Sequence, residues 1–334
     1  MTTRTMTLAA AALLLTGAEQ APPVPDYGAR LERFAYPWPV QTMQVAIVGE
    51  PAEMAFMDVA PAHPNGRSVV LLHGKNFCGA TWESSVRALT GAGYRVLVPD
   101  QIGFCKSSKP SSVQYSFAML AELTHRLMQA RGIARASIVG HSIGGMLAMR
   151  FALQYPQAVD RLVLVDPLGL VDRAQEGVPY VDLDTLWAGE RRTSFASIKA
   201  YQLANYYHGA WKPAYDRWVT MEAGMFAGAG RDAVALAQAK TSEMALTQPV
   251  AHELERIGAP TTVIVGTLDH TAFGRAQLPP DRRDTLPPIP AVAPAAVARM
   301  PDARLVRLEG LGHAPQVEDP ARFEATLLAA LGRS

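Results

Sequence analysis

The sequence predicts an α/β protein with a mostly parallel sheet covered by helices on both faces. Short apolar runs alternate with amphipathic segments of ten or more residues. The motif Gly140-His141-Ser142-Ile143-Gly144 stands between one such run and a helical segment. A chain of 334 residues can also bury a large core. Strands that alternate with helices of this length form parallel sheets whose two faces are both covered.

Eight apolar runs are the expected strands. They cover about 44–48, 54–59, 68–72, 94–98, 136–139, 161–166, 261–266 and 304–308. Helices are expected at about 81–90, 117–130, 146–153 and 321–331. The alternation stops between about 168 and 250, where short aromatic-rich segments look helical. The Pro-rich segment 278–294 is expected to be an irregular surface loop.

Residues 1–18 are typical of a secretory signal peptide. Arg4 precedes a ten-residue apolar run, and Thr16-Gly17-Ala18 supplies small residues for cleavage. This run is too short to span a bilayer; the alternative is an N-terminal tail. We therefore expect an exported protein, periplasmic or secreted, without stable membrane insertion. A Pro-rich linker is expected over 19–39.

The overall composition excludes a large charged interaction surface. Hydrophobic residues make up 49% of the chain and the net charge is +1. A nucleic-acid-binding footprint would need a clear excess of Lys and Arg, and no acidic tail is visible either.

The Gly-x-Ser-x-Gly motif suggests a nucleophile elbow. A strand, this motif and a helix in succession form a turn so tight that only small residues fit around the serine. The turn lifts the hydroxyl of Ser142 clear of the sheet and places it at a helix N-terminus. The motif is short, so the alternative is a glycine-rich turn without chemistry. Companion residues decide between the two.

A serine nucleophile needs a histidine base and a carboxylate that orients it. His313 lies in a glycine-rich loop between the last expected strand and the last helix. Asp269 follows the strand 261–266. The chain order serine, acid, histidine is the one used by sheets of this kind. Asp166, after another strand, is the alternative acid, and His270 is a rival base.

The same chemistry needs two N–H donors for a developing oxyanion. The backbone N–H of Ile143 is one candidate. The backbone N–H of Lys75, in the loop His73-Gly74-Lys75-Asn76, is the other. The ammonium group of Lys75 is expected to face solvent, as most lysines do.

The chain has two cysteines, too few for a small disulfide scaffold. Cys78 follows the strand 68–72, and Cys105 follows the strand 94–98. If these strands are parallel neighbours, both cysteines lie in loops at one sheet edge and a disulfide can form. The alternative is two unrelated buried thiols.

Taken together, these motifs resemble the α/β-hydrolase superfamily, in particular its cap-bearing serine hydrolases. The matching pieces are His73-Gly74, the loop 100–110, the elbow around Ser142, the segment 266–269, and Gly312-His313 with residues 318–320. The resemblance implies a core formed by 40–167 and 251–334, with a helical cap, 168–250, inserted after the sixth strand. It also implies that the two early strands are adjacent and parallel, which supports a Cys78–Cys105 bridge.

Serine at the elbow, rather than the aspartate of epoxide hydrolases and haloalkane dehalogenases in this superfamily, implies acyl chemistry. The leading hypothesis is a secreted hydrolase of a small carboxylic ester or lactone that works through an acyl-enzyme. No metal or organic cofactor is expected. The aromatic cap suggests an apolar or aromatic substrate, although most of its aromatic side chains are expected to form the cap's own core. Alternatives are a carbon–carbon bond hydrolase, a perhydrolase or acyltransferase, and a non-catalytic binding protein.

Overall fold

The structure, a computed structural model, describes residues 24–332. The signal peptide expected over 1–18 therefore lies outside the described residues. The strands are β1 (Gln41–Ile47), β2 (Glu50–Val59), β3 (Ser68–Leu72), β4 (Arg95–Pro99), β5 (Ala136–His141), β6 (Val159–Val165), β7 (Thr261–Gly266) and β8 (Ala303–Leu308). These eight strands confirm the expected set.

The eight strands form one sheet in the order β1-β2-β4-β3-β5-β6-β7-β8. β1 and β2 form an antiparallel pair, and β2 is also antiparallel to β4. From β4 to β8 every neighbouring pair is parallel. The carboxyl ends of these six strands therefore lie at one edge, where open α/β sheets bind ligands.

The helices are α1 (Glu83–Gly91), α2 (Phe117–Ala130), α3 (Ile143–Gln154), α4 (Leu183–Glu190), α5 (Phe195–Asn205), α6 (Asp216–Met225), α7 (Arg231–Thr247), α8 (Ile289–Val297), α9 (Pro315–Glu318) and α10 (Pro320–Gly332). The prediction of an irregular loop over 278–294 is wrong at its C-terminal end, because α8 begins at Ile289. The buried residues Ile289, Ala293 and Ala296 follow helical spacing and pack against the core. Pro290 occupies the first turn, where proline is tolerated.

Alternate residues of the central strands belong to two separate hydrophobic cores. Val70 and Leu72 of β3 pack in the core that contains α2, α3 and α8. Val69 and Leu71 pack in the core that contains α1 and α10. Because both faces are covered, β3 is a continuous apolar run rather than an alternating one.

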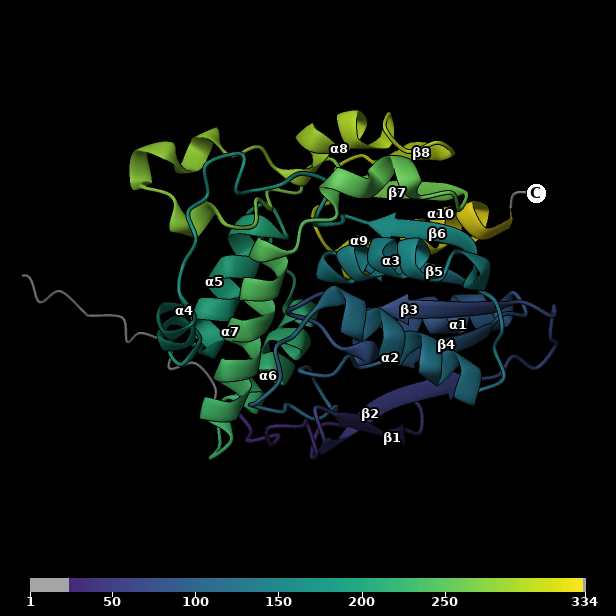
Figure 1. Cartoon of the computed structure of the whole chain (residues 1–334), viewed down its shortest axis with the longest axis horizontal. Coiled ribbons are helices and arrows are strands. Elements are labelled where there is room, and N and C mark those ends of the chain that lie inside the picture. Colours follow the sequence, from purple (N-terminus) through teal and green to yellow (C-terminus); the bar gives the residue numbers. More distant parts are fainter. Residues whose placement is uncertain (1–23, 333–334) are drawn as a thin grey trace, which may run out of the picture.

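The helices α4–α7, here called the inserted helices, lie between β6 and β7 in the chain and are grouped beside the sheet (Figure 1). Among the described residues, no helix is long and apolar enough to cross a membrane.

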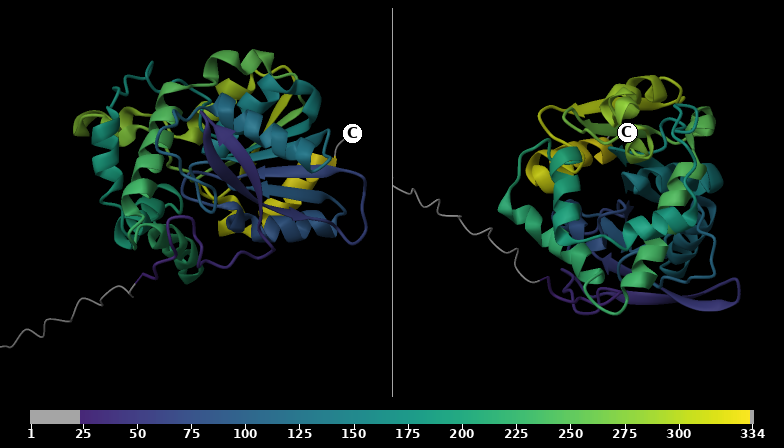
Figure 2. Two further views of the ribbon diagram at one scale, coloured as in Figure 1. Left: turned by 60° about the horizontal axis from the view of Figure 1, so that its bottom comes forward. Right: turned by 90° about the vertical axis from the view of Figure 1, so that its left-hand side faces the viewer.

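Residues 24–34 pack against the inserted helices instead of extending freely as a linker. Figure 2 shows this segment running beneath them. The N–H of Tyr27 donates to the carbonyl of Gly224 in α6 at 3.0 Å. Leu31 is fully buried, in one cluster with Met221 and Phe226. The described part of the expected linker thus braces the inserted helices.

A disulfide joins Cys78 and Cys105, as expected, with their Cα atoms 5.8 Å apart. The pairing of β3 with β4 is parallel and brings the two loops together. The bridge ties the loop after β3 to the loop after β4, and it closes a loop with a sequence separation of 27.

Replacing both cysteines by alanine should lower the free energy of unfolding by about 2–4 kcal/mol, because the unfolded chain regains the entropy of the closed loop. Urea unfolding monitored by fluorescence measures this change. A reductant should bring the wild type close to the variant and leave the variant unchanged. Equal unfolding midpoints for oxidised wild type and variant would show that the bridge does not stabilise the fold.

Candidate active site

Ser142 sits on a sharp turn between β5 and α3, in a backbone conformation that serine rarely adopts. Its φ is 56° and its ψ is −119°. A non-glycine residue at positive φ costs of order 1–3 kcal/mol, and it persists only where the surrounding packing enforces it. The residue is 5% exposed and lines a cavity.

Two glycines of the motif are required by close packing. A Cβ on Gly140 would come 2.2 Å from the carbonyl oxygen of Gly144, and a Cβ on Gly144 would come 2.4 Å from that of Leu72. Both contacts are with backbone atoms, which cannot move aside as a side chain can. The glycines therefore allow α3 to pack directly against β5 and β3.

His313 and Asp269 form a buried pair. The Nδ1 atom of His313 lies 2.8 Å from Oδ2 of Asp269, and both side chains are 0% exposed. The N–H of Thr271 donates to the other carboxylate oxygen of Asp269 at 2.7 Å. The Nε2 atom of His313 is buried and has no hydrogen-bond partner. The neighbouring His270 is exposed.

Asp166, the alternative acid, lies beside this pair rather than on the histidine. Its Oδ1 accepts the N–H of Gly266 at 2.9 Å. Burial and the charge of Asp269 raise the pKa of Asp166 well above its ordinary value. The raised pKa favours the protonated form of Asp166, which can donate a hydrogen bond to Asp269.

Contacts from three sides hold the loop that carries His313. The N–H of His313 donates to the carbonyl of Tyr206 at 2.9 Å, and the two rings lie 4.5 Å apart. Nε2 of His141, next to Ser142 in the elbow, donates to the carbonyl of His313 at 2.7 Å. The N–H of Gly312 donates to Glu318 at 2.6 Å. These bonds connect the histidine loop with the elbow and with the end of α5.

The loop after β3 is fixed beside Ser142. A Cβ on Gly74 would lie 3.2 Å from that of Ser142, so the backbone next to Lys75 approaches the serine closely. Nδ1 of His73 donates to the carbonyl of Gly74 at 2.9 Å, while its Nε2 accepts the N–H of Gln101 at 3.1 Å. Burial lowers the pKa of His73, so the ring is neutral, as these two bonds require.

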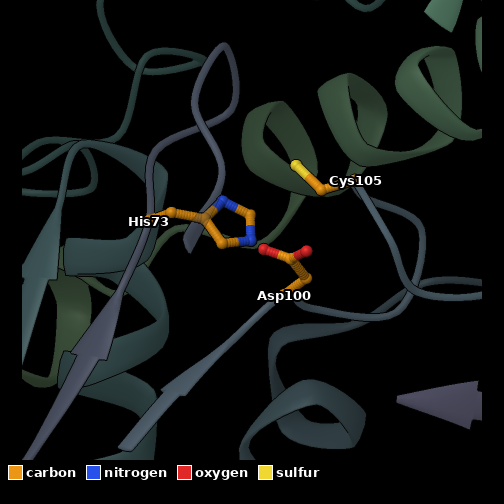
Figure 3. Close-up of side chains that lie close together, drawn as sticks. All are labelled: His73, Asp100 and Cys105. Atoms are coloured by element: carbon orange, nitrogen blue, oxygen red, sulfur yellow. The ribbon is translucent and has the colours of Figure 1, made fainter. Parts of the chain in front are cut away.

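Figure 3 shows His73, Asp100 and Cys105 close together. Each offers one potential metal-ligating atom, and these three atoms lie within 4.8 Å of one another. The sulfur of Cys105 is bonded to Cys78 and offers no thiolate. Oδ1 of Asp100 accepts the N–H of Gly79 at 2.7 Å, and its Oδ2 accepts the hydroxyl of Tyr36 at 2.7 Å. This trio therefore braces the loop after β3.

A second trio with metal-ligand spacing is formed by Asp166, Asp269 and His313. In this group the ring of His313 is committed to Asp269 through Nδ1. The raised pKa of Asp166 disfavours the charged form that a cation would need. The trio fits a histidine–carboxylate pair with a supporting acid.

A cavity of about 490 Å³ opens on Ser142. Such a volume is typical of small-molecule sites. Residues of the core and of the inserted helices line it together: Lys75, Asn76, Leu168, Glu190, Thr193, Ser197, Ile198, Tyr201, Asn205, Tyr206, Glu222, Ser242, Phe273 and Arg275 are among them.

The buried aromatic side chains of the inserted region were expected to form a core of its own, but they share a cluster with other parts of the chain. Tyr207, Tyr215, Trp218 and Phe226 are buried together with residues of the N-terminal segment and of the loops after β3 and β4. Tyr201 and Tyr206 are the aromatics of α5 and its C-terminal end that reach the cavity.

The side chain of Lys75 contradicts the expectation that it faces solvent. Its Nζ lies 2.7 Å from Oε1 of Glu190 at the end of α4, and the two side chains are 14% and 21% exposed. The inserted helices cover the loop after β3, so the ammonium group meets a carboxylate there instead of water. Both residues line the cavity.

Glu190 and Glu222 line the cavity, although neither was predicted from the sequence. Glu222 is 9% exposed, and burial raises the pKa of its carboxyl to about 8, against a smaller lowering by the charge of Lys75. A signal was available in α6: Glu222 stands four residues after Trp218 and three after Val219, both buried. Helical spacing thus puts a carboxyl on the buried face.

Comparisons with known proteins agree with this architecture. Residues 67–320 match the family model for the alpha/beta hydrolase fold. The crystal structure of a probable hydrolytic enzyme from Pseudomonas aeruginosa has a TM-score of 0.91 and 48% identity, over 92% of this chain and 99% of that one. An esterase from Exiguobacterium antarcticum has a TM-score of 0.69 and 18% identity, over 88% and 100% of the two chains, which shows the fold alone.

Matches to curated sequences are more local. An uncharacterised Mycobacterium bovis protein is 41% identical over 106 residues, which are 32% of this chain and 30% of that protein. The 2-hydroxy-6-oxo-6-phenylhexa-2,4-dienoate hydrolase of Burkholderia cepacia is 36% identical over 137 residues, 40% of this chain and 48% of that enzyme. The chain thus spans less than half the length of these relatives. Because the family model covers most of the chain, the protein belongs to the α/β-hydrolase fold family.

Proposed function

We propose that the protein is a serine hydrolase that cleaves a small carboxylic ester or lactone through an acyl-enzyme on Ser142. One observation carries the proposal: the buried His313–Asp269 pair leaves Nε2 of His313 without a partner, at the sheet edge where the strained turn presents Ser142. An unpaired buried nitrogen lowers the stability of the fold, and a catalytic role explains why it is retained.

In the proposed reaction, Nε2 of His313 takes the proton of the Ser142 hydroxyl while the serine oxygen attacks the ester carbonyl. His313 then gives the proton to the leaving alcohol, and an acyl-enzyme remains. A water molecule enters, loses a proton to the same nitrogen and attacks the acyl carbon. Nε2 then returns this proton to the oxygen of Ser142 as the Ser142–acyl bond breaks and the acid leaves. Asp269 holds the ring so that Nε2 faces the reaction, and it stabilises the imidazolium.

The oxyanion of each tetrahedral intermediate would be bound by the backbone N–H groups of Ile143 and Lys75. Ile143 is the first residue of α3, and the first N–H groups of a helix have no acceptor within it. The backbone of Gly74 packs against Ser142, which supports the N–H of the next residue, Lys75, as the second donor. Donors held in this way are already oriented when charge develops.

The proposed substrate is small because the cavity holds about 490 Å³. Leu168, Ile198 and Phe273 offer apolar surface for an alkyl or aromatic group.

We also propose export to an oxidising compartment. The Cys78–Cys105 bridge supports it, since disulfides persist there, together with the signal-like residues 1–18.

Hydrolysis of a carbon–carbon bond on the same residues is a second candidate. It is favoured by the local 36% identity with the dienoate hydrolase of Burkholderia cepacia. An activity screen over alkyl esters, lactones, aromatic esters and dienoate ketones distinguishes the two. The leading proposal expects turnover of esters or lactones in preference to ketones.

Replacing Ser142 by alanine should abolish both labelling by a fluorophosphonate probe and turnover of p-nitrophenyl esters, because the attacking oxygen is lost. Gel fluorescence and nitrophenol release measure the two effects. Ser197→Ala, which removes another hydroxyl from the cavity wall, should keep the labelling. Turnover that survives in Ser142→Ala would refute the proposed nucleophile.

Replacing Asp269 by asparagine should lower kcat by roughly 10²–10⁴-fold, because an amide no longer fixes the tautomer of His313. Asp166→Asn should have a much smaller effect, because Asp166 bonds the N–H of Gly266 and not the ring of His313. Steady-state kinetics of both variants measure the difference. A larger loss in Asp166→Asn would show that Asp166, and not Asp269, orients His313.

A further inference from the structure

Glu222 is a buried carboxyl group in the wall of the cavity that the proposed chemistry does not use. It lies on α6 and is 9% exposed. Its Oε2 atom is fully buried and has no hydrogen-bond partner. A buried acceptor without a partner destabilises the fold, so a ligand that satisfies it is a direct explanation for its presence.

The charges around Glu222 leave room for one more cation. Lys75 and Glu190 pair at 2.7 Å, and both act electrostatically on Glu222. Two carboxyl groups thus share one ammonium. Without a further cation, Glu222 avoids the excess charge by keeping its proton, since burial raises its pKa to about 8.

Arg275 also lines the cavity, but the cation whose charge acts on Glu222 is Lys75, which already pairs with Glu190. Tyr201 and Tyr206 are neutral phenols, and burial raises the pKa of each. The Lys75–Glu190 pair itself shows what the wall can hold: an ammonium group on a flexible chain, bound to a carboxylate of the inserted helices.

We propose that Glu222 binds a protonated amine of the substrate, so that the preferred substrate is an ester or lactone that carries an ammonium group at a distance from its carbonyl. The amine takes the place of the carboxyl proton, and Glu222 ionises when the ligand enters. The part that concerns hydrolysis rests on the proposed function, because Ser142 and Glu222 line the same cavity.

The first test compares two isosteric substrates at pH 8, p-nitrophenyl ε-aminocaproate and p-nitrophenyl heptanoate, which differ by an ammonium in place of a methyl group. The wild type should favour the cationic ester by about ten- to a hundredfold in kcat/KM, the range of one buried charge-assisted hydrogen bond. In Glu222→Gln this ratio should fall to near one. Asp232→Asn, which removes a carboxylate of α7 that pairs with Arg191, should keep the ratio.

The second test measures the binding of an amine in the absence of turnover. n-Butylammonium should raise the melting temperature of the wild type and of Asp232→Asn more than the neutral pentan-1-ol does. It should lose this advantage in Glu222→Gln. The comparison within the wild type stands even where Glu222→Gln does not fold.

The outcomes separate the two proposals. Turnover of both esters with no preference for the cationic one, and no added stabilisation by butylammonium, overturns the amine site while the hydrolase stands. Stabilisation by butylammonium without turnover or serine labelling overturns the hydrolase and retains the cation site. A preference that persists unchanged in Glu222→Gln overturns the role of this residue.

Discussion

The strained turn at Ser142 is the constraint on which the rest of the site depends. Its positive φ is maintained because α3 packs against the strands without any intervening side chain, which Gly140 and Gly144 permit. The same packing sets the first N–H of α3 beside the serine and lets His141 reach the carbonyl of His313 at 2.7 Å. A looser elbow would therefore displace the serine, the first N–H of α3 and the histidine loop together.

The loops around the site form hydrogen bonds with one another rather than with solvent. Asp100 holds the N–H of Gly79 next to the disulfide, and His73 fixes the turn that precedes Lys75. On the other side, Tyr206 and Glu318 hold the backbone of His313 and Gly312. Because these partners are buried, the loops at the sheet edge share the rigidity of the core. Such preorganisation is what electrostatic stabilisation of an oxyanion requires.

The sequence alone could predict the parts whose signals are local. The strands β3 and β7 are apolar runs bounded by polar or glycine-rich segments. The elbow directly follows β5, and Asp269 and His313 lie in the loops after β7 and β8. Contacts between distant segments carry no such signal. The ion pair of Lys75 with Glu190 joins residues 115 positions apart, and it exists because the inserted helices cover the loop. The prolines before and within α8 favoured the prediction of a loop, but the buried face of this segment stabilises a helix.

The most direct measurement of the central claim is mass spectrometry of the protein quenched in acid during turnover of a p-nitrophenyl ester. The account predicts an intact mass increased by the acyl group, with the modification on the peptide that contains Ser142. An acyl group on another residue, or steady turnover with no covalent adduct at any quench time, would contradict it.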